Sequence, residues 1–157
     1  MDAASVKELQ RLVEEEYSRL GVKCAVVEGE AENQTGDTLR LLLPVTEDGA
    51  MVLTELAVFR LEDELDLLTF YTTVLMNLEP DTPVAGALSG WNLTCPIGAF
   101  GILREEGRLF HKYTYPAPSA ARTEDVAASA EYAIELIFQA ISRYYGEALA
   151  LAEAESE

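Results

Sequence analysis

The sequence predicts an α+β fold with a single antiparallel sheet and three helices, in the order α-β-β-β-α-β-β-α. Amphipathic helical patterns stand near both ends of the chain, over residues 5–21 and from about Thr123 to Leu151. Between them, short apolar segments end at Gly, Pro, Asn or Asp, which is typical of strands joined by turns. Because 157 residues suit one core, we expect a single domain over residues 1–157 with an acidic, frayed tail from about residue 150.

The composition narrows the range of partners. The chain has 28 acidic and 11 basic residues, a formal net charge of −17 and a pI near 4.3. Such a charge repels nucleic-acid phosphates and no Lys/Arg cluster compensates, so we expect no nucleic-acid partner. The apolar runs are too short to span a bilayer, and the first 16 residues lack the basic start and the following apolar run that are typical of a signal peptide. We therefore expect a cytoplasmic protein with no membrane partner.

The first helix, residues 5–21, is followed by strands at residues 22–29 and 38–45. Ser5 and Glu8 have the spacing of a capping box, and Gly21 is a natural helix stop. The apolar residues of this helix recur at three- and four-residue intervals: Val6, Leu9, Val13, Tyr17 and Leu20.

The third predicted strand, residues 50–59, is apolar on both faces. It follows a turn at Glu47-Asp48-Gly49. Alternation places Met51, Leu53, Ala57 and Phe59 on one side of the strand. The other side carries Val52, Leu56 and Val58 beside Thr54. Since something must cover each side, we interpret Val52, Leu56 and Val58 as a partner-binding surface.

Residues 62–78 predict a second helix that is apolar nearly all round. Its acidic first residues suit a helix N-terminus, and its apolar positions occupy most of the helical wheel. A monomer of this size can hardly cover such a helix, so we expect a homodimer; a central helix covered by its own chain is the alternative. The predicted dimer interface consists of Leu67, Leu68, Tyr71, Val74, Leu75 and Leu78.

The second half of the chain begins with a connection over residues 79–90, rich in Pro and Gly. The stretch from Cys95 to Pro116 predicts two antiparallel strands that turn at Glu105-Glu106-Gly107. Alternation places Leu109, His111, Tyr113 and Tyr115 on one face, and Arg108, Phe110, Lys112 and Thr114 on the other. The last helix begins at Thr123, followed by two acidic residues.

No residue pattern predicts catalysis, a cofactor or a metal site. Cys24, Cys95 and His111 are the thiols and the imidazole of the chain, and their spacing matches no metal motif. Cys95 would need His111 as its base, but Pro96 follows it and no third group orients the pair. We therefore expect a protein that is not an enzyme. A small-ligand or enzymatic site near Trp91, Cys95 and His111 is the alternative.

Short motifs give this chain a family resemblance. The run LLTFYTTVLMNL, then GAFGILREEGRLFHKYTYP and a long final helix, resembles YbjN-like domains and the type III secretion chaperone (Tir chaperone-like) superfamily. The matching positions are Asn77, Gly98, Phe100, Gly101 and Gly107. About a dozen extra residues lie between Asn77 and Gly98, so the asparagine of the family motif corresponds equally well to Asn92. The resemblance implies a secretion-chaperone-like fold and a usually dimeric, non-enzymatic module that binds a protein partner.

These observations lead to one functional hypothesis. We expect a chaperone-like or adaptor-like homodimer that binds an effector or another polypeptide segment. A YbjN-type stress or signalling regulator is the nearest alternative.

Overall fold

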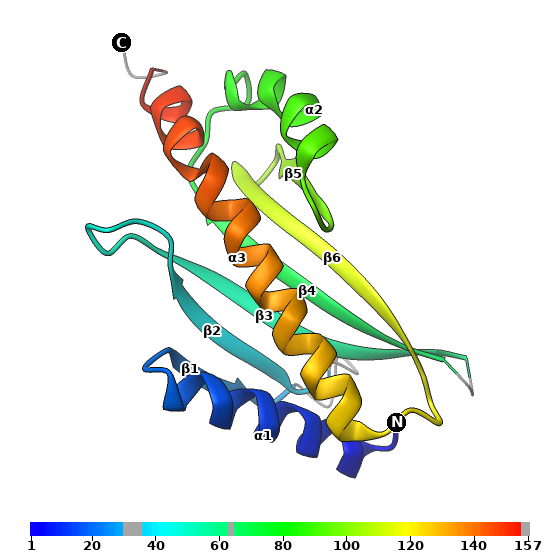
Figure 1. Ribbon diagram of the computed structural model, residues 1–157. Coiled ribbons are helices and arrows are strands. Elements are labelled where there is room, and N and C mark those ends of the chain that lie inside the picture. Colours follow the sequence, from blue (N-terminus) through cyan, green and yellow to red (C-terminus); the bar gives the residue numbers. More distant parts are fainter. Residues whose placement is uncertain (30–35, 63–64, 155–157) are drawn as a thin grey trace.

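The computed structural model describes residues 1–29, 36–62 and 65–154. Its strands form one antiparallel sheet in the order β1-β2-β3-β4-β6-β5 (Figure 1). The α+β class with a single antiparallel sheet and three helices is confirmed. The elements, in chain order, are α1 (Ala3–Arg19), β1 (Lys23–Val27), β2 (Thr38–Pro44), β3 (Met51–Glu62), β4 (Leu65–Leu75), α2 (Val84–Thr94), β5 (Ala99–Leu103), β6 (Arg108–Pro118) and α3 (Thr123–Glu153).

Residues 65–75 form strand β4, so the helix predicted over residues 62–78 is wrong. Buried residues alternate strictly with partly exposed ones along this strand. Thr, Phe, Tyr and Val are concentrated here, and such β-branched and aromatic residues favour strands. β4 pairs with β3 on one side and with β6 on the other. A central strand with two apolar faces resembles an all-round apolar helix when only hydrophobicity is considered.

The second helix is α2, which lies in the segment predicted as a connection. Pro83 precedes its first residue, and proline is compatible with a helix start. Two glycines weaken its intrinsic helix propensity. Val84 and Trp91 are nevertheless buried, because α2 packs against α3 and β5. Tertiary packing therefore forms this helix where propensity alone does not favour it.

Helix α1 begins one turn earlier than predicted. The Asp2 carboxylate accepts a hydrogen bond from the Ser5 backbone N–H at 2.8 Å, so Asp2 is the N-cap in place of Ser5. Gly21 has a φ of 84° and follows the helix end, as predicted. Leu9, Val13 and Tyr17 are buried. This face of α1 therefore packs into the core.

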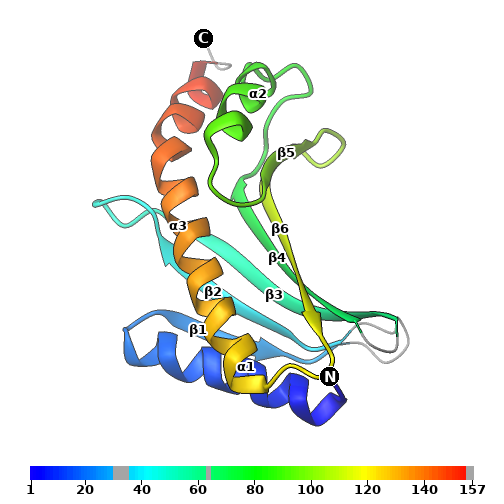
Figure 2. The same cartoon turned by 45° about the vertical axis from the view of Figure 1, so that its right-hand side comes forward.

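The core lies between the helices and one face of the sheet. α3 crosses the sheet on the same side as α1 (Figures 1 and 2). The Tyr17 hydroxyl donates a hydrogen bond to the Glu131 carbonyl at 3.2 Å and so joins α1 to α3. α3 continues through Gly146 to Glu153, past the predicted start of a frayed tail; residues 155–157 lie outside the described residues.

The β5–β6 hairpin follows the predicted alternation. Leu109 and His111 are buried toward the helices, whereas Phe110 and Lys112 lie on the opposite face. Gly107 closes the turn with a φ of 61°. The hairpin is therefore part of the scaffold, as the sequence indicates.

Candidate functional site

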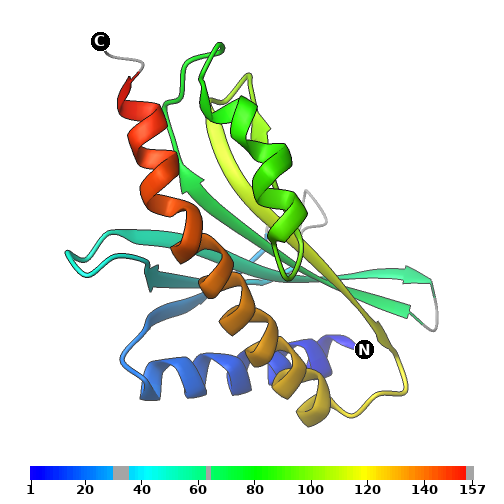
Figure 3. The same ribbon diagram turned by 45° about the horizontal axis from the view of Figure 1, so that its top comes forward.

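The sheet face turned away from the helices, called the open face below, is the candidate functional surface. α2 lies on the same side of the sheet as α3 (Figures 2 and 3), and no described helix covers the other side. The register of the strands places one set of side chains on this face: Lys23, Arg40, Leu42, Met51, Leu53, Glu55, Ala57, Phe59, Leu67, Thr69, Tyr71, Thr73, Arg108, Phe110, Lys112 and Thr114.

Large apolar side chains are exposed on the open face. Met51 and Phe59 keep 55% and 51% of their surface accessible. The rings of Tyr71 and Phe110 stack with their centroids 5.3 Å apart. Single exposed apolar residues are ordinary, but a contiguous apolar patch marks an interaction surface. The open face is therefore a candidate binding surface.

A groove of about 410 Å³ runs across one end of the open face. Leu42, Leu53 and Met51 supply apolar walls, and Arg108 and Glu55 add one cation and one carboxylate. The Nε atom of Arg108 is buried and has no hydrogen-bond partner among the described residues, and the same is true of the Tyr71 hydroxyl oxygen. Buried polar atoms are normally paired; elsewhere on its guanidinium, Arg108 has a partner, since its Nη2 lies 3.4 Å from the Glu106 carboxylate.

The residues predicted as the partner-binding surface lie on the other side of the sheet. Val52 and Leu56 are 2% and 0% exposed, and Val58 packs against the same core. These side chains belong to the core cluster or pack against it, so they do not form an accessible surface. The strand has two apolar faces, and it is the opposite set, with Met51, Leu53 and Phe59, that is accessible.

The six residues predicted as the dimer interface are divided between the two faces. Leu68, Val74 and Leu78 are buried, and Leu75 packs against the core. Leu67 and Tyr71 lie on the open face. The division follows from the strand period of two, which separates residues that a helix would place together. Only Leu67 and Tyr71 are therefore placed where a second subunit would meet them.

The alternative site near Trp91 is a packed aromatic cluster. Trp91 stacks on Tyr144 with centroids 5.6 Å apart and meets Phe100 edge-on. Phe100 in turn meets the ring of His111 edge-on at 5.0 Å. The indole Nε1–H of Trp91 donates to the Glu147 carboxylate at 3.1 Å. These rings join α2, β5, β6 and α3, which is a structural role.

Cys95 and His111 are close together, as a catalytic pair would require, but their hydrogen bonds do not suit catalysis. The Cys95 Sγ lies 3.6 Å from His111 Nε2. Both atoms also contact the Ile97 carbonyl, Nε2 at 2.8 Å and Sγ at 3.0 Å. Since a carbonyl only accepts, Nε2 carries the proton and does not act as a base toward the thiol. Burial lowers the pKa of His111, although the Ile97 bond opposes this.

The predicted motif residues have backbone roles at the end of β4. Asn77 takes a φ of 62°, and the following residue, Leu78, donates its N–H to the Gly107 carbonyl at 2.9 Å. A Cβ atom on Gly107 would lie 2.5 Å from the Leu78 carbonyl oxygen. The motif therefore secures the contact between β4 and the turn before β6.

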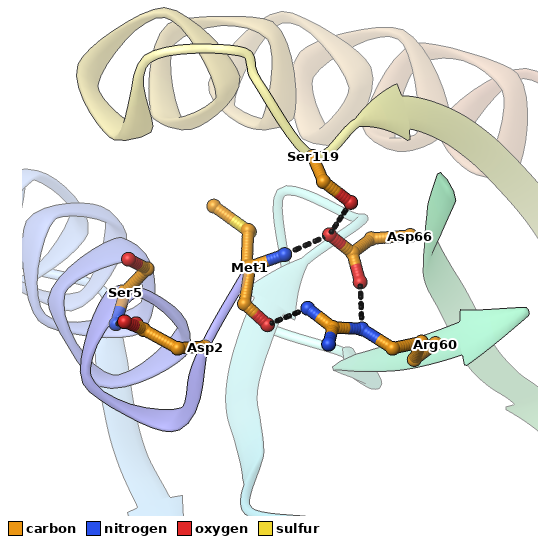
Figure 4. Close-up of polar contacts among 6 residues, drawn as sticks. All are labelled: Met1, Asp2, Ser5, Arg60, Asp66 and Ser119. Atoms are coloured by element: carbon orange, nitrogen blue, oxygen red, sulfur yellow. Dashed lines mark hydrogen bonds and ion pairs between the residues drawn. The ribbon is translucent and has the colours of Figure 1, made fainter. Parts of the chain in front are cut away.

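The N-terminus is held by a polar network (Figure 4). The Met1 ammonium group contacts the carboxylate of Asp66, which is 1% exposed. Arg60 Nε lies 3.5 Å from the other oxygen of this carboxylate, and the Arg60 guanidinium donates to the Met1 carbonyl at 2.6 Å. Burial alone would raise the pKa of Asp66, but the Met1 ammonium, Arg60 and Ser119 together hold it below its usual value. The network fixes the start of α1 against β3 and β4.

Neither metal ligation nor membrane crossing is evident in the described part of the chain. No group of three or more His, Cys, Asp or Glu side chains in residues 1–29, 36–62 and 65–154 converges as a metal site. None of the helices in these ranges has the length and apolar character that a bilayer span requires.

Comparison with known proteins gives a match at the level of fold. No protein-family model and no curated protein match the chain. Among solved structures it is similar to YbjN from E. coli, which is described as a candidate transcription regulator. The two are 16% identical, the TM-score is 0.51, and the match covers 90% of this chain and 91% of the other. The resemblance expected from the sequence is thus confirmed for the architecture, and the chain has a YbjN-like fold.

Proposed function

We propose that this protein is a non-enzymatic, chaperone-like or adaptor-like protein that binds a polypeptide partner across the open face. The observation that carries the proposal is the presence of Phe59, Leu67 and Tyr71 on two neighbouring strands, on the side of the sheet that no described helix covers. Burying such a surface against a partner is favourable by roughly 25 cal/mol per Å² of apolar area.

The size of the open face supports this function. The central strands have 11 or 12 residues and belong to a six-stranded sheet. With ordinary strand spacing the face measures roughly 800 Å², which is about what each partner contributes to a stable interface. One partner would therefore cover it.

The arrangement around Cys95 supports a role other than catalysis. Its neighbour His111 donates to the Ile97 carbonyl, and the adjoining rings fill the space around Trp91. These side chains serve packing in this proposal, and substrate chemistry has no part in it.

A second copy of the chain, in a homodimer, is the competing partner for the open face. Leu67 and Tyr71, two of the predicted interface residues, lie on it. Light scattering distinguishes the two arrangements, because the chain mass is 17.2 kDa and a dimer doubles it.

A second candidate function is regulation through a protein partner. The shared fold with YbjN, a candidate transcription regulator, favours it. The net charge of −17 disfavours direct contact with DNA, so a regulator of this kind would act through the same polypeptide-binding surface.

The test is capture of partners from the native host with immobilised wild-type protein and two variants. Phe59→Thr removes an exposed ring from the open face and keeps a strand-forming residue. Leu93→Gln, on α2, is the matched control, because Leu93 is 86% exposed and lies away from that face. Both variants should unfold within a few degrees of the wild type.

We expect wild type and Leu93→Gln to capture the same polypeptide and Phe59→Thr to lose it. Equal capture by all three proteins, or no specific capture by any, would show that the open face is not a polypeptide-binding site.

A further inference from the structure

Basic side chains gather on the open face of this strongly acidic protein. Four of the 11 basic residues lie there: Lys23, Arg40, Arg108 and Lys112. Among the strand side chains that the structure describes, Glu55 is the only carboxylate on this face, and Arg40 Nε lies 3.2 Å from it. Glu106, in the turn before β6, lies 3.4 Å from Arg108. Four cations thus meet two carboxylates, and the face keeps a local positive charge within a chain of net charge −17.

The helix side has the opposite character. A cleft of about 330 Å³ between α1 and α3 is lined by Glu15, Glu16, Glu124 and Glu131, with Arg19 as the cation. Burial and the nearby Glu16 raise the pKa of Glu131, as expected for crowded carboxyl groups. The two sides of the molecule thus differ in charge.

The cations of the open face stand beside its apolar side chains. Arg40, Glu55, Tyr71 and Lys112 occupy one row across β2, β3, β4 and β6. Phe110 stacks on Tyr71 next to this row. Arg108 lines the groove together with apolar residues and Glu55. Its Nη2 lies 3.4 Å from Glu106, whereas its buried Nε has no hydrogen-bond partner among the described residues. A ligand that fills the groove would therefore bring apolar groups and carboxylates to the same place.

We propose that the open face binds an acidic polypeptide segment that carries large apolar side chains. This inference rests on the proposed function and specifies the chemistry of its partner. Carboxylates of the segment pair with Arg40, Arg108 and Lys112, while its apolar side chains pack on Phe59, Phe110 and the groove. Two copies placed face to face would instead bring these cations against one another, which opposes association. Charge complementarity therefore favours an acidic partner over a second copy.

The experiment is a selection from a random 12-residue peptide display library against the immobilised full-length protein. A double variant, Arg40→Glu with Lys112→Glu, reverses the charge of the open face. Lys7→Glu with Arg11→Glu makes the same net change on α1 and is the matched control. Because all four substituted residues are exposed, both double variants should remain folded, and thermal unfolding checks this. Arg40→Gln with Lys112→Gln is a milder substitute.

We expect the selected peptides to be enriched in Asp and Glu together with Leu, Ile, Phe or Trp. Replacing the acids of a selected peptide by their amides should weaken binding at least tenfold. The open-face double variant should bind the original peptide at least tenfold more weakly, and the α1 double variant should bind it within twofold of wild type. Higher salt should reduce the affinity for wild type.

Other outcomes overturn the inference in distinguishable ways. Selection of neutral apolar peptides that bind the wild type but not Phe59→Thr would refute the acidic partner and leave the proposed function intact. A library without enrichment would refute both. If light scattering gives a dimer mass for the wild type and a monomer mass for Phe59→Thr, a second copy of the chain occupies the face.

Discussion

Asn92 makes both of the hydrogen bonds that Phe100 would otherwise make with a further strand. Its Oδ1 accepts from the Phe100 N–H at 2.6 Å, and its Nδ2 donates to the Phe100 carbonyl at 3.0 Å. β5 is an edge strand of the sheet, and an unpaired edge invites pairing with other chains. The side chain of one helical residue thus closes part of this edge.

Substitution of Asn92 should open the edge locally. We expect Asn92→Ala to lower the free energy of unfolding by about 1 kcal/mol and to accelerate hydrogen exchange at the Phe100 amide. Asn92→Asp is the control, because its carboxylate still accepts from that amide but no longer donates to the carbonyl. Unchanged protection of Phe100 in the Ala variant would contradict the pairing.

Gly107 should be less tolerant of a side chain than Gly21. Both have positive φ, 61° and 84°, so an alanine at either position costs about 1 kcal/mol in backbone strain. A Cβ atom at Gly107 also meets the Leu78 carbonyl oxygen at 2.5 Å, whereas nothing lies within 4 Å at Gly21. We expect Gly107→Ala to cost about 3 kcal/mol in total. Urea unfolding measures both losses, and equal values would show that Leu78 yields without cost.

Asp66 should contribute to stability above acidic pH. Asp66→Asn removes the ion pairs with Met1 and Arg60, and we expect a loss of about 3 kcal/mol at pH 7. Because the folded-state pKa is lowered, this contribution is present above the ordinary value of 3.8 and disappears as pH falls through the lower folded value. Wild type and variant should therefore converge in stability at low pH. Glu15→Gln, at an exposed ion pair, should change stability by less than about 0.5 kcal/mol at every pH.

His111 should make the protein less stable in mild acid. Burial lowers its pKa below 6.5 in the folded state, so the unfolded chain binds a proton first as the pH falls. The free energy of unfolding therefore decreases from pH 6.5 downward until the folded-state pKa is passed, and this residue adds no slope above 6.5. His111→Gln retains a donor for the Ile97 carbonyl but does not titrate. Urea unfolding measures the free energy of unfolding of both proteins between pH 7.5 and 5. If it decreases equally with falling pH in both, His111 is not the cause of the decrease.

Cys95 should react as an ordinary, partly buried thiol. We expect a maleimide to label Cys95 in the Cys24→Ser variant no faster than a free thiol at neutral pH, because His111 Nε2 donates to Ile97 and takes no proton from sulfur. Labelling of Cys24 in the Cys95→Ser variant gives the comparison, since Cys24 is also partly buried. Much faster labelling of Cys95 would favour a catalytic role for the site near Trp91.

The terminal helices and the β6 face could be predicted because each depends on a local repeat. In α1, Leu9, Val13 and Tyr17 are buried as their spacing indicates. In β6, His111 lies in the core and Lys112 outside it, as alternation predicts. Such patterns arise from helix and strand geometry and need no knowledge of distant contacts.

The candidate site could be predicted only in part. The two apolar faces of β3 were evident from alternation, but nothing in the strand itself shows which face the helices cover. Val52 and Leu56, predicted from the sequence as a binding surface, are buried, and the accessible apolar side chains of this strand include Met51 and Phe59. The row from Arg40 to Lys112 joins four strands and has no counterpart in any local pattern.

The sequence by itself determined the α+β class, the outer helices, the hairpin and the acidic charge, because these depend on composition and on short-range periodicity. Only the tertiary structure settled that residues 65–75 are a central strand and that residues 84–94 are a helix. The first depends on two neighbouring strands that pair with it, and the second on the contacts of Trp91 with Phe100 and Tyr144. The open face, with its cations beside apolar rings, likewise exists only because pairing of strands distant in sequence brings these residues together.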